Sequence, residues 1–190
     1  MRRLPWLSIL IIGAMVFAAL FAPLLTPYSP IEQSLPEKLL PPFWEAKGTG
    51  KYILGTDIFG RDMLTRLLHG AQISLIVTSL SLLVGGGVGL AIGIVSGYIG
   101  GRVDSFLMRL VDAAFTFPAI LFALLLAVTM GQGLGTLVIA ISLLLWAGFA
   151  RVIRGEVLAL KERDFIALAK VHGCSELRIM VTHILPNVMN

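Results

Sequence analysis

Charged residues and cysteine are scarce in this sequence. Only 14% of its 190 residues are Asp, Glu, Lys or Arg, and Cys174 is the single cysteine, whereas about a quarter of the residues in soluble domains are charged. A lone cysteine excludes an internal disulfide and any CxxC pair for zinc or redox chemistry. The basic residues form no stripe with interleaved aromatics, so we expect no nucleic acid partner.

Motifs for phosphate binding and catalysis are also missing. The glycine-rich "GGGVG" at 85–89 lies inside an apolar run, no Lys-Ser/Thr pair follows it, and it does not satisfy GxGxxG. The apolar runs contain no Asp-Asp, Ser-His or His-Glu set suited to catalysis. We therefore expect no enzyme, no catalytic residue and no cofactor bound by this chain.

Apolar residues are abundant instead. They make up 57% of the chain, and the mean hydropathy is +0.90. Four uncharged runs approach or exceed the roughly 20 helical residues that cross a bilayer, which predicts an all-α polytopic membrane protein with four transmembrane helices. Its expected parts are an N-terminal anchor over 1–26, an extracytoplasmic segment over 27–72, and a core over 73–190 with spans at about 73–99, 105–130 and 134–152 and a helix-turn-helix loop at about 153–190.

The orientation of the chain is predicted from its first run and its charges. This run follows Arg2 and Arg3 and also resembles a secretory signal peptide, but it is longer than the usual core of about 7 to 15 residues, so we favour an uncleaved anchor. Positive charge marks cytoplasmic loops. Segment 27–72 holds five Lys/Arg and five Asp/Glu, whereas segment 151–190 holds six and four. We expect the N-terminus and 151–190 in the cytoplasm.

This topology bears on the three histidines. It places His69 outside and both His172 and His183 inside, so the three side chains do not converge. The inner pair lacks a third ligand at metal spacing. We therefore expect no metal site.

Glycine recurs at every fourth position of the second run. Residues four apart stack on one helical ridge, and a ridge of small residues lets another helix backbone approach closely in lipid. The alternative is that glycine is simply common in membrane helices, but a strict register favours tight helix packing. The ridge comprises Gly85, Gly89, Gly93, Gly97 and Gly101.

A few charges lie close to the third run. These charges are Asp104, Arg109 and Asp112, of which Arg109 and Asp112 are three residues apart and are predicted to form a structural ion pair on one helical face. A substrate site is the alternative reading, since charges at membrane depth are often functional. Pro118 is expected to kink this helix.

The chain ends in two short amphipathic segments around Gly173, which is expected to terminate the first of them. Ser175 is expected to cap the second, in which Leu177, Met180, Val181, Ile184 and Leu185 follow helical spacing until Pro186 ends or kinks it. Such a helix pair suits docking into the groove of another protein. Attachment to the lipid interface is the alternative.

Three stretches resemble the binding-protein-dependent ABC importer permeases of the dipeptide, oligopeptide and nickel branch. The spacing from Ala169 over Gly173 to Leu185-Pro186 resembles their EAA loop, and "HILPN", "LGTDIFGRDMLTRLLHGAQISL" and "GGRVDSFLMRLVDAAFTFPAILFALLLA" resemble this branch. Ala167 replaces the glutamate of the motif, Leu168 its first alanine and His183 its isoleucine. By resemblance, the residues for ATPase coupling are Ala167, Ala169, Gly173, Leu177, Met180, Val181, His183, Leu185 and Pro186.

The resemblance implies an importer permease in a prokaryotic inner membrane. Its partners are expected to be a second homologous permease, two cytoplasmic ATPases that bind ATP and Mg, an extracytoplasmic substrate-binding protein and the lipid bilayer. Peptides are the leading substrate and nickel is the alternative. Members of this family have six spans, so the last two are expected to be missing here, and a truncated subunit that does not transport is a further alternative.

Overall fold

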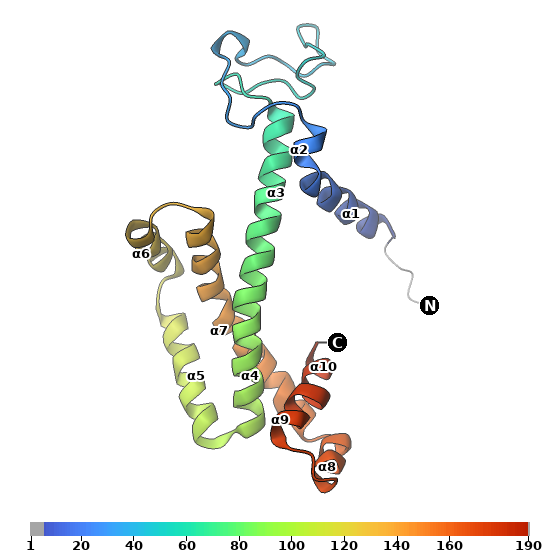
Figure 1. Cartoon of the computed structure of the whole chain (residues 1–190). Helices are drawn as coiled ribbons and strands as arrows, with labels where there is room; N and C mark the ends of the chain where they lie inside the picture. The colour runs from blue at the N-terminus through green and yellow to red at the C-terminus, as the bar shows by residue number, and fades with distance from the viewer. Residues whose placement is uncertain (1–5, 190) are drawn as a thin grey trace. The chain divides into compact units, whose positions relative to one another are not determined.

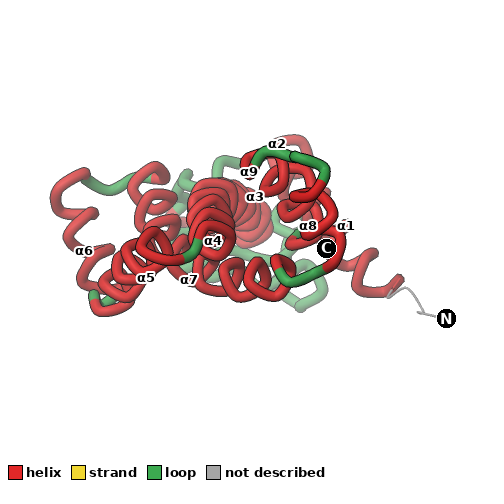
Figure 2. The backbone as a smooth tube through the Cα atoms, turned by 90° about the horizontal axis from the view of Figure 1, so that it is seen from below, coloured by secondary structure: helices red, strands yellow, loops and turns green. Residues whose placement is uncertain are grey.

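The computed structural model describes residues 6–189, so Arg2 and Arg3 lie outside the described residues. The chain divides into two compact units, Met1–Ile76 and Val77–Asn190. Within 6–189 the regular structure is helical and no strand forms, as Figure 2 shows. This confirms the predicted all-α fold class.

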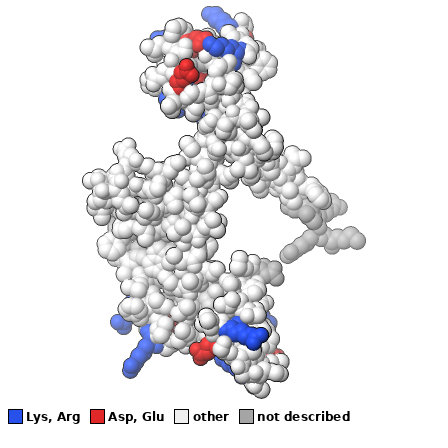
Figure 3. Space-filling model, viewed as in Figure 1, with Lys and Arg blue, Asp and Glu red and all other residues white. Residues whose placement is uncertain are grey.

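The first unit contains two short apolar helices and a long irregular segment. The two helices are α1 (Trp6–Leu20) and α2 (Ala22–Leu25), and the irregular segment contains the 3-10 turn η1 (Leu35–Glu37). The irregular segment ends at Asp62, whose Oδ2 accepts the Thr65 N–H at 2.9 Å and so caps the next helix, α3 (Met63–Ser81). In Figure 3, the charged side chains visible on this unit gather around its irregular segment.

The helix that begins at Met63 continues without interruption to Ile99. It consists of α3, the π-helix η2 (Leu82–Gly86) and α4 (Gly87–Ile99), so helix starts well before the predicted span at 73. Gly100 then adopts φ +73°, a left-handed conformation that favours glycine, and ends the helix. The chain turns there into α5 (Gly101–Thr116).

The segment of the predicted third span, 105–130, consists of two helices with a bend between them. α5 ends at Thr116, Phe117 and Pro118 are extended, and α6 (Ala119–Met130) leaves at 83°. Proline drives the residue before it out of the helical region, which explains the break at Phe117. The kink expected at Pro118 is therefore present, and it is a full bend (Figure 1).

Two of the four predicted spans have helices long and apolar enough to cross a membrane. These are Met63–Ile99 and α7 (Leu134–Lys161), and the bent pair α5 and α6 adds a third if it counts as one span. The first predicted span corresponds to α1, a shorter apolar helix of 15 residues.

α4 and α7 form the most extensive helix pair of the second unit, and α5 packs beside both (Figure 2). Four glycines of the predicted ridge face α7. A Cβ at Gly89 would lie 2.5 Å from the Trp146 carbonyl oxygen, and one at Gly93 would lie 2.7 Å from the Ile153 Cβ. The glycine backbone therefore lies directly against backbone and side-chain atoms of α7 along this seam, which also includes Gly85 and Gly97.

Gly101 does not belong to this seam. A Cβ at this position would meet nothing within 4 Å. The reason is that α4 ends at Ile99, and both Gly100 and Gly101 have positive φ, so the register of four residues per step is lost before Gly101 is reached.

Candidate functional site

The C-terminal segment folds back against the ends of α4 and α7. After α7 the chain forms α8 (Asp164–Val171), turns at Gly173 with φ +74°, and continues as α9 (Glu176–Arg178), the π-helix η3 (Ile179–Ile184) and α10 (Leu185–Val188). We call residues 164–188 the C-terminal loop. Its turn has room around it, since a Cβ at Gly173 would meet nothing within 4 Å. The positive φ is therefore what favours glycine there.

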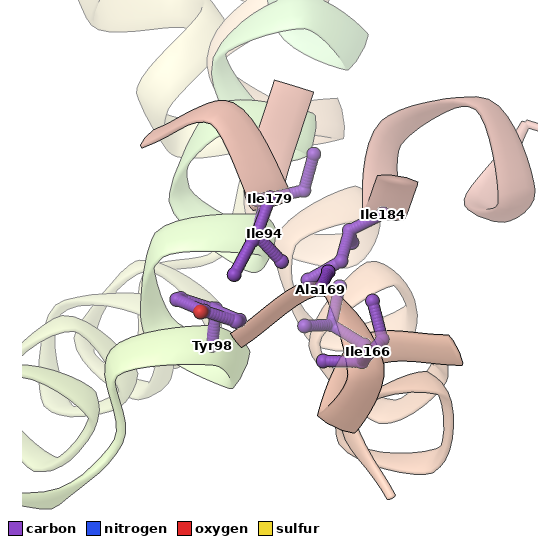
Figure 4. Packing of buried hydrophobic residues seen from close by; sticks show 7 residues of the cluster. Ile94, Tyr98, Ile166, Ala169, Ile179 and Ile184 are labelled. Atoms are coloured by element: carbon purple, nitrogen blue, oxygen red, sulfur yellow. The ribbon is translucent and has the colours of Figure 1, made fainter. Parts of the chain in front are cut away.

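A small hydrophobic core attaches this loop to the helix pair, and Figure 4 shows side chains of this core lying close together. Ile166 and Ile184 are fully buried, and Ile179 is 1% exposed. They pack with side chains of α4 and α7, so the loop and the long helices share one core. The buried members of this loop core are Ile94, Tyr98, Val157, Ile166, Ala169, Ile179 and Ile184.

Tyr98 connects α4 to α7 and to α8. Lys161, in the last turn of α7, donates from Nζ to the Tyr98 carbonyl oxygen at 2.6 Å. That carbonyl belongs to the last turn of α4, where acceptors lack partners within the helix and a cation is favourable. The ammonium groups of Lys161 and Lys170 also lie 5.7 and 5.5 Å from the centre of the Tyr98 ring.

A polar cluster joins three helices at the same end of the unit. The Arg154 guanidinium donates two hydrogen bonds to the Asp104 carboxylate, at 2.5 and 2.6 Å. The Ser96 hydroxyl donates to the same carboxylate at 2.5 Å. A bidentate ion pair, the strong geometry for such contacts, thus joins α5 to α7, and the Ser96 hydroxyl adds α4 to the cluster. In Figure 3, the charged side chains of this unit gather where α5 begins and α7 ends.

The predicted ion pair between Arg109 and Asp112 is wrong. Asp112 instead accepts a hydrogen bond from Arg151 of α7 at 2.5 Å, and among residues 6–189 Arg109 forms no ion pair within 4.0 Å. A cation placed before an anion is the weaker order on a helix surface, whereas α7 brings Arg151 directly beside α5. Arg151 also lies 4.4 Å from the centre of the Phe115 ring.

The structure places the nine predicted coupling residues in two environments. Ala169 is buried in the loop core, and Met180, His183 and Leu185 are half-buried, Met180 and Leu185 packing against that core. Leu177 and Val181 are 69% and 54% exposed. The exposed members are Ala167, Gly173, Leu177, Val181 and Pro186.

Sequence spacing included Ile184 but missed Ile179, and both residues anchor the loop. Ile179 and Ile184 are five apart, so an α-helix would not put them on one face, whereas a π-helix bonds residue i to i+5 and brings them together. Pro186 lies two positions beyond η3, inside α10, so the helix passes through it instead of ending there. Ser175 occupies the N-cap position, but its side chain makes no capping bond.

The family assignment follows from a comparison with known proteins. The model of the family described as binding-protein-dependent transport system inner membrane component matches residues 89–190, more than half of the chain. The chain belongs to this family. A second model, the N-terminal TM domain of oligopeptide transport permease C, matches residues 1–42. The family resemblance read from the sequence is confirmed.

Named relatives come from the same branch. The dipeptide transport system permease protein of Bacillus subtilis is 37% identical over 99% of this chain and 57% of its own length. The di/tripeptide transport system permease protein of Pseudomonas aeruginosa is 37% identical over 92% of this chain. The nickel transport system permease protein of Escherichia coli is 35% identical over 94% of this chain and 62% of its own length. The chain thus spans about three fifths of these relatives.

Proposed function

We propose that this chain is a permease subunit of an ATP-driven importer for di- or oligopeptides. Its relatives named for peptide transport support the substrate class, and the nickel permease keeps nickel as the alternative. In this proposal the N-terminus and the C-terminal loop face the cytoplasm. The partners are a second permease, two ATPases that bind ATP and Mg, and an extracytoplasmic substrate-binding protein.

The observation that carries the proposal is the two-sided C-terminal loop. One side shares a core with α4 and α7, so a displacement of the loop is transmitted to the long helices. The other side presents apolar residues, Leu168, Val171, Leu177 and Val181, all more than half exposed. Isolated exposed apolar residues are ordinary, but a group on one short polar loop suits a protein partner.

Co-purification tests this docking surface. The chain, in its native membrane, is tagged, extracted in mild detergent and assayed for bound ATPase subunits. Leu177→Glu with Val181→Glu should abolish the association, because two charges would be buried in the interface. Val103→Glu is the matched control, since Val103 is an exposed apolar residue of α5 outside the loop. Normal ATPase recovery with the loop variant would contradict the proposal.

The Gly173 turn offers an independent test. Gly173→Arg must adopt φ +74° at a cost of about 1–2 kcal/mol, so the second half of the loop should be displaced. We expect the variant to insert into the membrane and to lose the ATPases.

A separate experiment distinguishes the two substrate classes. It measures uptake of radiolabelled dipeptide and of nickel by cells with the complete system.

A further inference from the structure

The irregular segment of the first unit encloses a polar cavity of about 290 Å³. Its walls come from residues 28–62 alone, so the cavity lies within one unit. Three acidic side chains, Glu32, Glu37 and Asp62, line it together with one lysine, Lys51. The lining therefore carries more negative than positive charge and favours a cation.

Both carboxylate oxygens of Glu37 already accept hydrogen bonds. Lys51 Nζ donates to its Oε1 and the Tyr52 hydroxyl donates to its Oε2, both at 2.6 Å. These contacts hold the pKa of Glu37 well below its usual range. Glu37 thus braces the wall of the cavity and leaves ligand binding to the other acidic groups.

Asp62 has an oxygen with no partner. Its Oδ2 accepts the backbone N–H and the hydroxyl of Thr65 at the start of α3. Its Oδ1 has no hydrogen-bond partner among residues 6–189, although the residue is only 6% exposed and lines the cavity. An unpaired buried carboxylate oxygen is costly, so this atom calls for a donor from within the cavity.

Two tyrosines complete the lining. The rings of Tyr28 and Tyr52 lie 5.4 Å apart, inclined at 45°, and Lys51 Nζ lies 4.8 Å from the centre of the Tyr52 ring. A cation at Tyr28 would meet the same kind of aromatic surface. No group of three His, Cys, Asp or Glu side chains among the described residues is arranged to hold a metal ion. The lining suits an organic cation better.

We propose that this cavity binds a primary ammonium group, which donates hydrogen bonds to Asp62 Oδ1 and lies among Glu32 and Tyr28. An ammonium carries three donors and a compact charge. It therefore matches an unpaired carboxylate oxygen, a second carboxylate and an aromatic ring at once. The source is either a small free amine or a lysine side chain of an adjoining protein.

Saturation-transfer NMR tests the site on the full chain in zwitterionic lipid nanodiscs. The probe is n-butylammonium, 1-butanol is the uncharged control of equal length, and empty nanodiscs give the background. Asp62→Asn keeps an oxygen for the α3 cap and removes the charge, and Glu32→Gln alters an exposed residue. Each should weaken binding about tenfold or more, as loss of a charge-assisted contact does. Glu45→Gln, an exposed acidic residue outside the cavity, should bind normally.

Equal signals from the wild type and both cavity variants would overturn the proposal, as would equal signals from butylammonium and butanol. Circular dichroism verifies that the variants are folded. If Asp62→Asn does not fold, Glu32→Gln still tests the site. A second arm adds the substrate-binding protein of the proposed importer, with native or acetylated lysines. If the substrate-binding protein displaces butylammonium with native lysines but not with acetylated ones, the ammonium group comes from a lysine. If butylammonium stays bound with both forms, the ammonium group comes from a free amine.

Discussion

Individual side chains in this chain take their partners from distant elements. Asp104 is bound by Ser96 and Arg154, which belong to α4 and α7. Asp112 is bound by Arg151 instead of its helical neighbour Arg109. In both cases a guanidinium on α7 reaches a carboxylate on α5, so the charged residues near the third predicted span lock helices together.

The residue scale also sets a pH dependence for the first unit. Hydrogen bonds from Lys51 and Tyr52 lower the pKa of Glu37 from 4.5 to about 2. A carboxyl whose pKa is lowered on folding contributes stability above its unfolded pKa, and this is lost as pH falls through the folded pKa. The contribution of Glu37 should therefore disappear between pH 4.5 and 2.

Lys51→Gln should raise the lower end of that window by about one pH unit, because it removes the charged partner of Glu37 and so raises the folded pKa, while the unfolded pKa stays the same. Pepsin is active in this range, so cleavage within residues 31–59 of the chain in nanodiscs reports the opening. Lys47→Gln removes an exposed lysine outside the contact and serves as the control. Identical cleavage profiles for the two variants would refute the role assigned to Lys51.

At the scale of elements, helix contact rests on the absence of side chains. Gly85, Gly89, Gly93 and Gly97 let α4 and the preceding π-helix lie against the α7 backbone. In lipid, close packing replaces the hydrophobic effect as the force between helices. The seam is therefore intolerant of even one added carbon.

Gly89→Ala should destabilise the helix pair by about 1–3 kcal/mol, since its Cβ would lie 2.5 Å from a backbone oxygen. Gly87→Ala is the matched control two residues away. It adds a Cβ where nothing lies within 4 Å, and alanine favours helix by about 1 kcal/mol over glycine. Thermal unfolding in detergent, followed by circular dichroism, should give a lower midpoint for Gly89→Ala alone. If the midpoint of Gly89→Ala lies at or above that of wild type, α7 shifts to accommodate the added Cβ.

For the whole second unit, the loop core decides whether the C-terminal loop moves with the long helices. Its fully buried members come from α7, α8 and η3, and Ile94 and Tyr98 of α4 complete it. A loop attached in this way transmits displacement, whereas a loop held only by its chain connection would not. This attachment is the physical basis of coupling in the proposed importer.

Ile179→Ala should release the loop, because removing a fully buried isoleucine side chain costs about 2–5 kcal/mol. Hydrogen exchange of the chain in nanodiscs should become faster across 164–188 and stay unchanged in the middle of α7. Val181→Ala trims an exposed neighbour and should exchange like wild type. Unchanged protection in Ile179→Ala would mean that the loop is held by other contacts.

Much of this protein is determined by its sequence alone. Composition and long apolar runs specify a helical membrane protein, and Gly173 with Leu185 and Pro186 indicates the family. Helical periodicity and glycine register are local properties, so they predicted the seam positions from Gly85 to Gly97 and the turn at Gly173. The boundaries of the anchor, outer segment and core stay predictions.

Tertiary structure alone decided the rest. It paired Asp112 with Arg151, buried Ile179 with Ile184 through a π-helix, and folded the irregular segment 28–62 into the cavity around Asp62. The ion pair and the cavity depend on which residues the fold brings together, and the burial of Ile179 with Ile184 depends on a local departure from α-helical spacing. Sequence periodicity describes one regular helix at a time, so it could predict neither contacts between distant elements nor a π-helical segment.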